Sequence, residues 1–398
     1  MIQLFNIIIL FIFLYFIILK KNPIISIETD KKILIFLHLL TIFVINDSVN
    51  SLSNTSYATH GYSHYFPDQS RYLDGVIALR ENVFSIFNTK GNFYMGHHLS
   101  NYWYDTNESM KGSVKAVIIF YSFSPFIVVP NDLIALNLTN YLLFLFLFIF
   151  LVRRNYNQLS QYIYLFIPSI FIFHSLVLKD FLLIFCVFFY FSTFFERRYL
   201  LSLLILFLIY FFRPHLSYFI LFSAILHSYF FVIRNLELKY KYIFSILIIL
   251  SIIIISNAFE YQILTKINEV SKGFFSETDQ NINEYHYYKN YTDLSLSIFL
   301  NLLYVLLGKI SSSVFETFSV IENFIITSII LYNYIFYKLY KKLKYNILGI
   351  TILFYYSFLS VTVFNSGAID RYKLPLEITL LLFSFYFTHD NYKKLIND

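Results

Sequence analysis

Residues 132–154 read DLIALNLTNYLLFLFLFIFLVRR, an apolar run that a pair of arginines ends. About 20 apolar residues are the length of a helix that crosses the hydrocarbon core of a bilayer. The whole chain has a similar character: of its 398 residues, 58% are hydrophobic and only 14% are charged. Soluble domains carry about 25% charged residues. The sequence therefore predicts an all-α integral membrane protein.

Eleven stretches have this composition, and we expect each to form a transmembrane helix of one polytopic domain, residues 1–398. The predicted spans are residues 2–19, 33–46, 132–152, 161–178, 181–195, 199–212, 216–233, 242–257, 319–337, 346–364 and 375–389. We expect the first to be a retained span and not a signal peptide, because Lys20 and Lys21 follow it rather than precede it.

Basic clusters predict the orientation of these spans, since lysine and arginine in short loops favour the cytoplasmic side. With eleven spans, the clusters all fall on one side. They are Lys20, Lys21, Lys31, Lys32, Arg153, Arg154, Arg197, Arg198, Arg234, Lys239, Lys241, Lys338, Lys341, Lys342, Lys344, Lys393 and Lys394. We therefore expect a multi-pass membrane protein with its N-terminus outside and its C-terminus in the cytoplasm.

Two further apolar stretches, residues 114–130 and 295–308, would invert this charge pattern if they crossed the membrane. We expect both to form short interfacial or re-entrant helices on the outer side. They would belong to two sizeable outer loops, at about residues 47–131 and 258–318.

Four polar segments lie at the predicted outer boundary. They are residues 65–74 (YFPDQSRYLD), 174–180 (HSLVLKD), 213–215 (RPH) and 365–375 (NSGAIDRYKLP). Each has an ordinary structural explanation: a helix cap at Asp68, a Lys179–Asp180 ion pair, an interfacial anchor at Arg213, and a solvated loop before Pro375. Their accumulation on one side favours a shared site over four independent explanations.

The residue types in these segments suit a lipid-linked diphosphate. Arginine binds phosphate oxygens through two donors, and lysine adds a point charge. The predicted diphosphate-binding residues are Arg71, Lys179, Arg213, His215, Arg371 and Lys373. Asp68 is the predicted general base that accepts a proton from an incoming hydroxyl group. Tyr72, Asp180 and Asp370 are predicted supporting residues.

Several classes of site are not indicated. The chain has one cysteine, no zinc-type Cys/His spacing and no phosphate-binding G-x-x-x-x-G-K-[ST] loop. The net charge of +6 follows the basic clusters and does not indicate nucleic acid. Gln69 follows Asp68, and a lone carboxylate is a poor ligand set for a divalent metal. We expect no metal and no other cofactor.

Four segments resemble parts of known membrane glycosyltransferases. PDQSRYLDGVIAL, residues 67–79, resembles the first-loop motif of the GT-C superfamily, and RYKLPLE, residues 371–377, is similar to a segment near the end of many such enzymes. IPSIFIFHSLVLKD, residues 167–180, followed by FFRPH, residues 211–215, resembles repeat-unit polymerases of the Wzy type from surface-polysaccharide clusters. The resemblance implies that Asp68 is the catalytic base and that Lys179, Arg213 and Arg371 occupy substrate-binding positions.

The function implied is polymerisation of undecaprenyl-diphosphate-linked oligosaccharide repeat units, for O-antigen or capsule, at the outer face of the bacterial cytoplasmic (inner) membrane. The alternative is a GT-C enzyme that moves a single sugar from a polyprenyl-phosphate donor. A transporter of lipid-linked sugars fits less well, because transporters place polar groups near the bilayer centre. The expected partners are the lipid-linked oligosaccharides and membrane lipid, with a place for a chain-length regulator protein.

Overall fold

The computed structural model of the chain describes residues 2–15, 27–53, 72–73, 75–77, 79–80, 112–129, 132–154, 156, 158–177, 179–235, 260–276, 287–307, 314–336, 343–362 and 366–397. Within these residues the regular structure is helical, and an isolated bridge between Val129 and Asp132 is the one β-type pairing. The prediction of an all-α protein is confirmed.

The helices overlap the predicted spans, apart from residues 242–257, which lie outside the described residues. They are α1 (Ile2–Leu14), α2 (Thr29–Ser53), α4 (Gly112–Ser122), α5 (Ile134–Arg153), α6 (Gln158–Phe166), α7 (Pro168–Ser175), α8 (Lys179–Phe195), α9 (Tyr199–Phe212), α10 (Pro214–Asn235), α12 (Glu260–Ser276), α13 (Tyr291–Leu307), α14 (Val314–Phe336), α15 (Leu343–Thr362) and α16 (Ser366–Asn397).

Helix length and composition identify fewer candidate membrane spans than the eleven expected. Among the residues that the structure describes, α5 is the one helix both long and apolar enough to cross a membrane, and the bent pair α7 and α8 would add a second. Shorter apolar helices occur at α1, at α9 and within α14 and α15. The difference arises because several expected spans, such as residues 181–195 and 199–212, contain fewer than about 20 residues.

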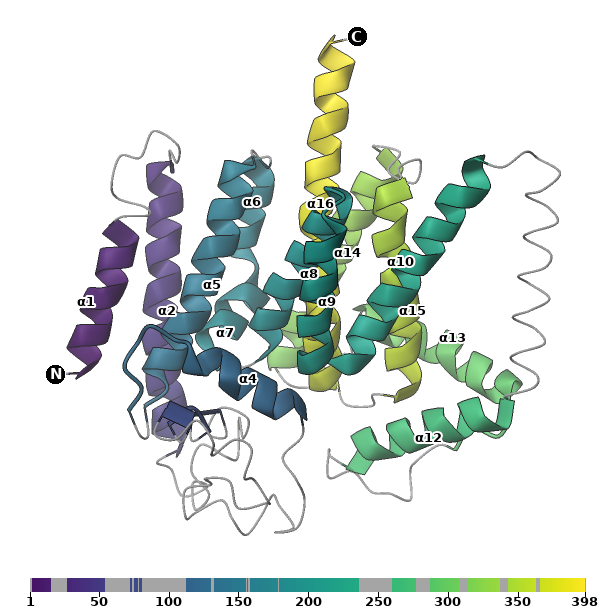
Figure 1. Ribbon diagram of the computed structural model, residues 1–398, viewed down its shortest axis with the longest axis horizontal. Helices are drawn as coiled ribbons and strands as arrows, with labels where there is room; N and C mark the ends of the chain where they lie inside the picture. Colours follow the sequence, from purple (N-terminus) through teal and green to yellow (C-terminus); the bar gives the residue numbers. More distant parts are fainter. Residues whose placement is uncertain are drawn as a thin grey trace. The chain divides into compact units, whose positions relative to one another are not determined.

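The chain forms two compact units, Met1–Pro214 (unit 1) and His215–Asp398 (unit 2). In unit 1, helices α1, α2, α5, α6, α8 and α9 stand side by side, and α4 lies across one end of them (Figure 1). As expected from the sequence, residues 114–130 do not form a long upright helix, because α4 ends at Ser122, shortly before Pro125.

The two ends of unit 1 differ in their charged residues. The N-terminus of α5 lies near α4, where Thr139 donates a hydrogen bond to Ser124. Its C-terminus, about 30 Å away, carries Arg154, which pairs with Glu196 beside Arg198. We call the first the α4 end and the second the basic end. The predicted basic clusters at residues 153–154 and 197–198 therefore share one end of this unit.

The predicted span 161–178 is not one continuous helix, which corrects that expectation. Pro168 cannot donate a backbone hydrogen bond, so α6 ends at Phe166 and α7 starts at Pro168. Helices α7 and α8 are then bent by 118° to each other. The predicted spans 161–178 and 181–195 are therefore two short helices, α6 and α7, followed by the longer helix α8.

In unit 2, helices α10, α14, α15 and α16 stand upright, and α12 and α13 lie across one end of them (Figure 1). Asn268 of α12 exchanges two hydrogen bonds with the backbone of Tyr288, whose hydroxyl donates to the Val361 carbonyl at the end of α15. Helix α16 begins at Ser366 and contains Pro375 in its interior. The predicted loop at residues 365–375 is therefore helical from residue 366, which corrects the expectation that Pro375 opens the last helix.

Candidate functional site

An ion pair forms where α8 begins and α9 ends. These helices are antiparallel neighbours of similar length, joined by a tight turn in which Arg197 has a positive φ of 63°. The first turn of α8 therefore lies beside the residue that follows α9. This geometry brings together Asp180 and Arg213, which are 33 residues apart in the sequence.

The pair is buried at the α4 end of unit 1. Arg213 donates from Nη2 to Oδ1 of Asp180 over 2.7 Å, and the side chains are only 1% and 0% exposed. Lys179, the first residue of α8, is half-buried. Asp180 thus has a partner, Arg213, that is distant in the sequence. A guanidinium held in this way has a fixed orientation, as a bidentate phosphate ligand requires.

Between residues 72 and 80, the described residues 72–73, 75–77 and 79–80 are helical. This segment is anchored to α4. The Tyr72 ring lies 6.2 Å from the Tyr121 ring. Arg80 donates three hydrogen bonds to the carbonyl groups of Ser122, Ser124 and Phe126, at and beyond the C-terminus of α4. A cation at a helix C-terminus is also favoured by the helix dipole.

Helix α4 connects this segment to the ion pair. Its Phe120 ring contacts the Phe212 ring edge-on at 6.4 Å, directly before Arg213. Tyr121 donates to Asn140 on α5, and Asn140 donates to the Leu176 carbonyl shortly before α8. Burial raises the pKa of Tyr121, and the negative charge of Asp180 raises it further. Three polar segments singled out from the sequence therefore approach one another in unit 1.

The contact between the first-loop segment and α4 gives a stability prediction. A Cβ atom on Gly75 would lie 2.3 Å from Cδ1 of Ile118, and Ile118 is fully buried. We expect Gly75→Ala to lower the free energy of unfolding by about 1–3 kcal/mol through overpacking. The double variant Gly75→Ala/Ile118→Val removes Cδ1 but keeps Cγ1, 2.8 Å from the added Cβ, so we expect it to regain only part of this loss. Thermal unfolding of the purified variants measures both effects, and an unchanged melting temperature for Gly75→Ala would disprove the contact.

Unit 2 contains a second group of predicted site residues. The His215 ring lies 6.0 Å from Tyr355 and 5.8 Å from Tyr372. Lys373 is buried; its ammonium donates to the Val305 carbonyl at 3.1 Å and lies 3.9 Å from Glu377. The segment around Arg371, which is partly exposed, therefore lies beside His215.

Some predicted residues cannot be placed. Asp68 and Arg71 lie outside the described residues, as does the side chain of Asp370, whose backbone belongs to α16. Tyr72, Lys179, Asp180 and Arg213 are placed in unit 1, and His215, Arg371 and Lys373 in unit 2. The roles of Asp68 as general base and of Arg71 as a diphosphate-binding residue thus stay predictions from the sequence.

Buried polar residues that sequence reasoning missed occur in both units. Glu377 accepts a hydrogen bond of 2.6 Å from Tyr356. His38 of α2 lies 2.7 Å from His174 of α7, Nδ1 to Nε2, and both rings are fully buried. A lone histidine inside an apolar run was the available signal at residue 38. Its position midway along a predicted span contradicts the expectation that unusual polar residues gather at one boundary.

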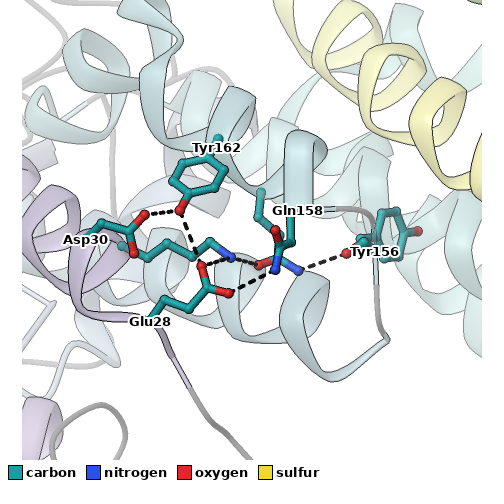
Figure 2. Close-up of polar contacts among 7 residues, drawn as sticks. Glu28, Asp30, Tyr156, Gln158 and Tyr162 are labelled. Atoms are coloured by element: carbon teal, nitrogen blue, oxygen red, sulfur yellow. Dashed lines mark hydrogen bonds and ion pairs between the residues drawn. The ribbon is translucent and has the colours of Figure 1, made fainter.

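A further polar cluster joins α2 to α6 at the basic end of unit 1 (Figure 2). Lys31 is buried, donates to Gln161 at 3.0 Å and pairs with Glu28 at 3.2 Å. The Tyr162 hydroxyl donates to Asp30 and Glu28, and Gln158 donates to Glu28. These contacts attach the N-terminus of α2 to the N-terminus of α6, so Lys31 has a structural role besides its place in a basic cluster.

Among the described residues no group of three or more His, Cys, Asp or Glu side chains could hold a metal ion. Comparison of the chain with protein-family models, with curated proteins and with solved structures found no match. The geometry of the two units is therefore the basis for a functional proposal, together with the motifs of the sequence.

Proposed function

We propose that this chain is a multi-pass membrane glycosyltransferase that polymerises lipid-diphosphate-linked oligosaccharide repeat units, as the enzymes of the Wzy type do. The acceptor hydroxyl attacks the anomeric carbon of the growing chain, and the lipid diphosphate leaves. The reaction then needs a base near the hydroxyl and cations near the diphosphate. It takes place at the outer face of the bacterial cytoplasmic membrane.

Exposed apolar helix faces support a membrane location. Soluble proteins rarely expose contiguous apolar patches larger than a few hundred Å². Here large apolar side chains are exposed along three helices. They are Leu4, Phe5, Ile8, Phe11 and Ile12 of α1, Leu200, Leu203, Leu204, Phe207 and Phe211 of α9, and Ile321, Phe324, Ile325, Leu331 and Ile335 of α14. Basic residues 154 and 198 meet at one end of unit 1, as the proposed orientation requires.

The observation that carries the proposal is the approach of three distant segments at the α4 end of unit 1. The segment that follows Asp68 packs on α4 through Tyr72 and Arg80. Helix α4 contacts Phe212 beside Arg213, and Arg213 pairs with Asp180. The segment that follows the first-loop carboxylate motif and a buried arginine therefore lie at the same end of one unit, opposite the basic end.

The proposed roles follow from the first-loop motif for Asp68, from charge and position for Arg213 and Lys179, and from exposure for the two cations of unit 2. Asp68 is the base, as the first-loop motif implies. Arg213, oriented by Asp180, and the half-buried Lys179 neutralise the diphosphate. In unit 2, Arg371 is the partly exposed cation of its segment, whereas Lys373 has partners within the protein. We therefore assign substrate contact to Arg371 rather than to Lys373.

A transporter of lipid-linked sugars is the second candidate, and one observation favours it. His38 and His174 form a buried pair midway along α2. Ionisable residues inside a membrane often mark a transport or proton pathway. The two functions predict different surface glycans, so a single experiment separates them.

The test is the length distribution of surface polysaccharide from a strain that lacks the gene, compared with the same strain complemented by the wild-type chain. A polymerase predicts that the deletion removes the long-chain ladder on a gel while single repeat units still reach the surface. Loss of every unit, single ones included, would contradict polymerisation and indicate an earlier transferase or a transporter. An unchanged ladder would exclude all three functions.

A further inference from the structure

Helix α6 ends at Phe166, and Pro168, the first residue of α7, has no backbone N–H to donate to a carbonyl group of α6. His38, on the neighbouring helix α2, compensates: its Nε2 lies 2.9 Å from the Leu165 carbonyl oxygen. His38 therefore caps the broken helix from outside.

The directions of the hydrogen bonds around this pair follow from that contact. A carbonyl oxygen only accepts, so Nε2 of His38 carries the hydrogen. In a neutral ring Nδ1 of His38 then accepts, and Nε2 of His174 donates to it over 2.7 Å. The Nδ1 atom of His174 is left with a lone pair. It faces the Ser175 hydroxyl oxygen at 3.3 Å.

Ser175 provides a hydrogen-bond acceptor for one more proton on His174. Its hydroxyl donates to the Phe171 carbonyl at 2.7 Å, so its oxygen presents a lone pair toward His174. The Thr41 hydroxyl, 3.2 Å from Ser175, donates to the His38 carbonyl. A proton added at Nδ1 of His174 would thus find an acceptor at 3.3 Å. It could not pass beyond His38, because the Leu165 carbonyl ends the chain.

In this structure α7 packs against α2, and we call this the closed arrangement. The surroundings of the histidine pair in the closed arrangement oppose a positive charge. The His38 ring stacks on Phe171 at 3.6 Å and lies 4.3 Å from Phe144. The titratable groups facing the pair are Tyr141 of α5 and Tyr164 of α6, whose hydroxyls donate to carbonyl groups. On α8, Phe181 contacts His174, and the nearby carboxylate of Asp180 is paired with Arg213. A charge here gains little from neighbours and is separated from water.

We propose that His38 and His174 form a proton-binding site that couples proton uptake to movement of α7, the short helix that leads to Lys179 and Asp180. Proton uptake is easier when water reaches the rings, which requires α7 to move away from α2. Because protons bind the open arrangement more tightly, proton uptake shifts the equilibrium between the closed and open arrangements toward the open one. The same movement displaces the Leu176 carbonyl from Asn140 at the candidate site.

The sign of the effect follows from linkage. The closed pair is neutral, whereas a hydrated imidazole titrates near pH 6.5. The open arrangement then binds more protons below about pH 6.5, and the closed arrangement loses stability as the pH falls. Each proton taken up on opening makes opening about tenfold more favourable per pH unit.

Hydrogen–deuterium exchange of the full chain in detergent tests the proposal without any assay of activity. We expect the protection factors of peptides from residues 168–177, corrected for the intrinsic pH dependence of exchange, to fall at least about tenfold between pH 7 and pH 5. Peptides from α9 are the internal control and should keep their protection. Equal loss in α9, or no change with pH in residues 168–177, would overturn the proposal.

His174→Gln is the matched variant. A glutamine amide can still donate to Nδ1 of His38, but it does not titrate in this range. With only His38 left to take up a proton, we expect the protection factors to fall by about 25-fold between pH 7 and pH 5, against about 600-fold when both rings take up a proton near pH 6.5. A fall as steep as that of the wild type would assign the pH response to other groups. Because exchange is independent of polymer synthesis, the proton site and the polymerase function can fail separately.

Discussion

Replacing Arg213 with leucine is expected to destabilise the protein strongly, and replacing Asp180 as well is expected to restore the fold but not polymer synthesis. Removal of one partner from a buried ion pair leaves an uncompensated charge and costs about 3–5 kcal/mol. Replacement of both partners by apolar residues of similar size is often neutral or stabilising. Since both side chains are buried, the pair meets the conditions for this behaviour.

The experiment compares Arg213→Leu, Asp180→Leu and Arg213→Leu/Asp180→Leu. The melting temperature of each purified protein reports the fold, and the polysaccharide ladder of each complemented strain reports activity. A folded double variant without a ladder would show that Arg213 is needed for polymer synthesis and not only for the fold. A folded double variant with a normal ladder would show that the ion pair only supports the fold, and diphosphate binding by Arg213 would then be wrong.

Much of the fold follows from the sequence because the apolar runs that the structure describes are largely helical. Residues 134–153 are a single helix, and residues 114–130 give only a short helix lying across the others. Both outcomes follow from composition and from charge on either side of each run. The number of membrane-crossing helices does not follow, because runs such as residues 199–212 have the right composition and too few residues.

The pairing of the site residues was less predictable. Asp180 has an adjacent lysine in the sequence, yet it pairs with Arg213, because the antiparallel α8–α9 hairpin brings the start of α8 beside the end of α9. Local spacing favours neighbours, whereas the hairpin places distant residues in contact. Lys373 illustrates the opposite case. Once α16 extends through Pro375, its i,i+4 neighbour is Glu377, and a predicted substrate ligand becomes part of an internal network.

The His38–His174 pair could not be found from the sequence. The two residues are 136 positions apart, and their contact depends on the break at Pro168 and on the packing of α2 against α7. A proline inside an apolar run signals a break, but it does not say which side chain caps the exposed carbonyl group. Tertiary packing supplies that information.

Asp68→Asn is expected to abolish the long-chain ladder while the protein keeps its wild-type melting temperature. General base catalysis contributes about 10²–10⁴-fold to a rate, and an amide cannot accept the proton of the attacking hydroxyl. The substitution changes one atom of the side chain, so its effect on packing is small. The ladder of the complemented strain measures the loss, with single repeat units expected to accumulate.

Asp132→Asn, at the α4 end of unit 1, is the matched control. Asp132 accepts hydrogen bonds from Gln3 and from the backbone of Ile134 at the start of α5, and an asparagine oxygen can still accept the latter. We expect a normal ladder from this variant, because its carboxylate has a capping role. If both variants gave normal ladders, Asp68 would not be the base, although Arg213 could still bind the diphosphate. If both abolished the ladder, the loss would reflect negative charge at this end of the unit rather than proton transfer at Asp68.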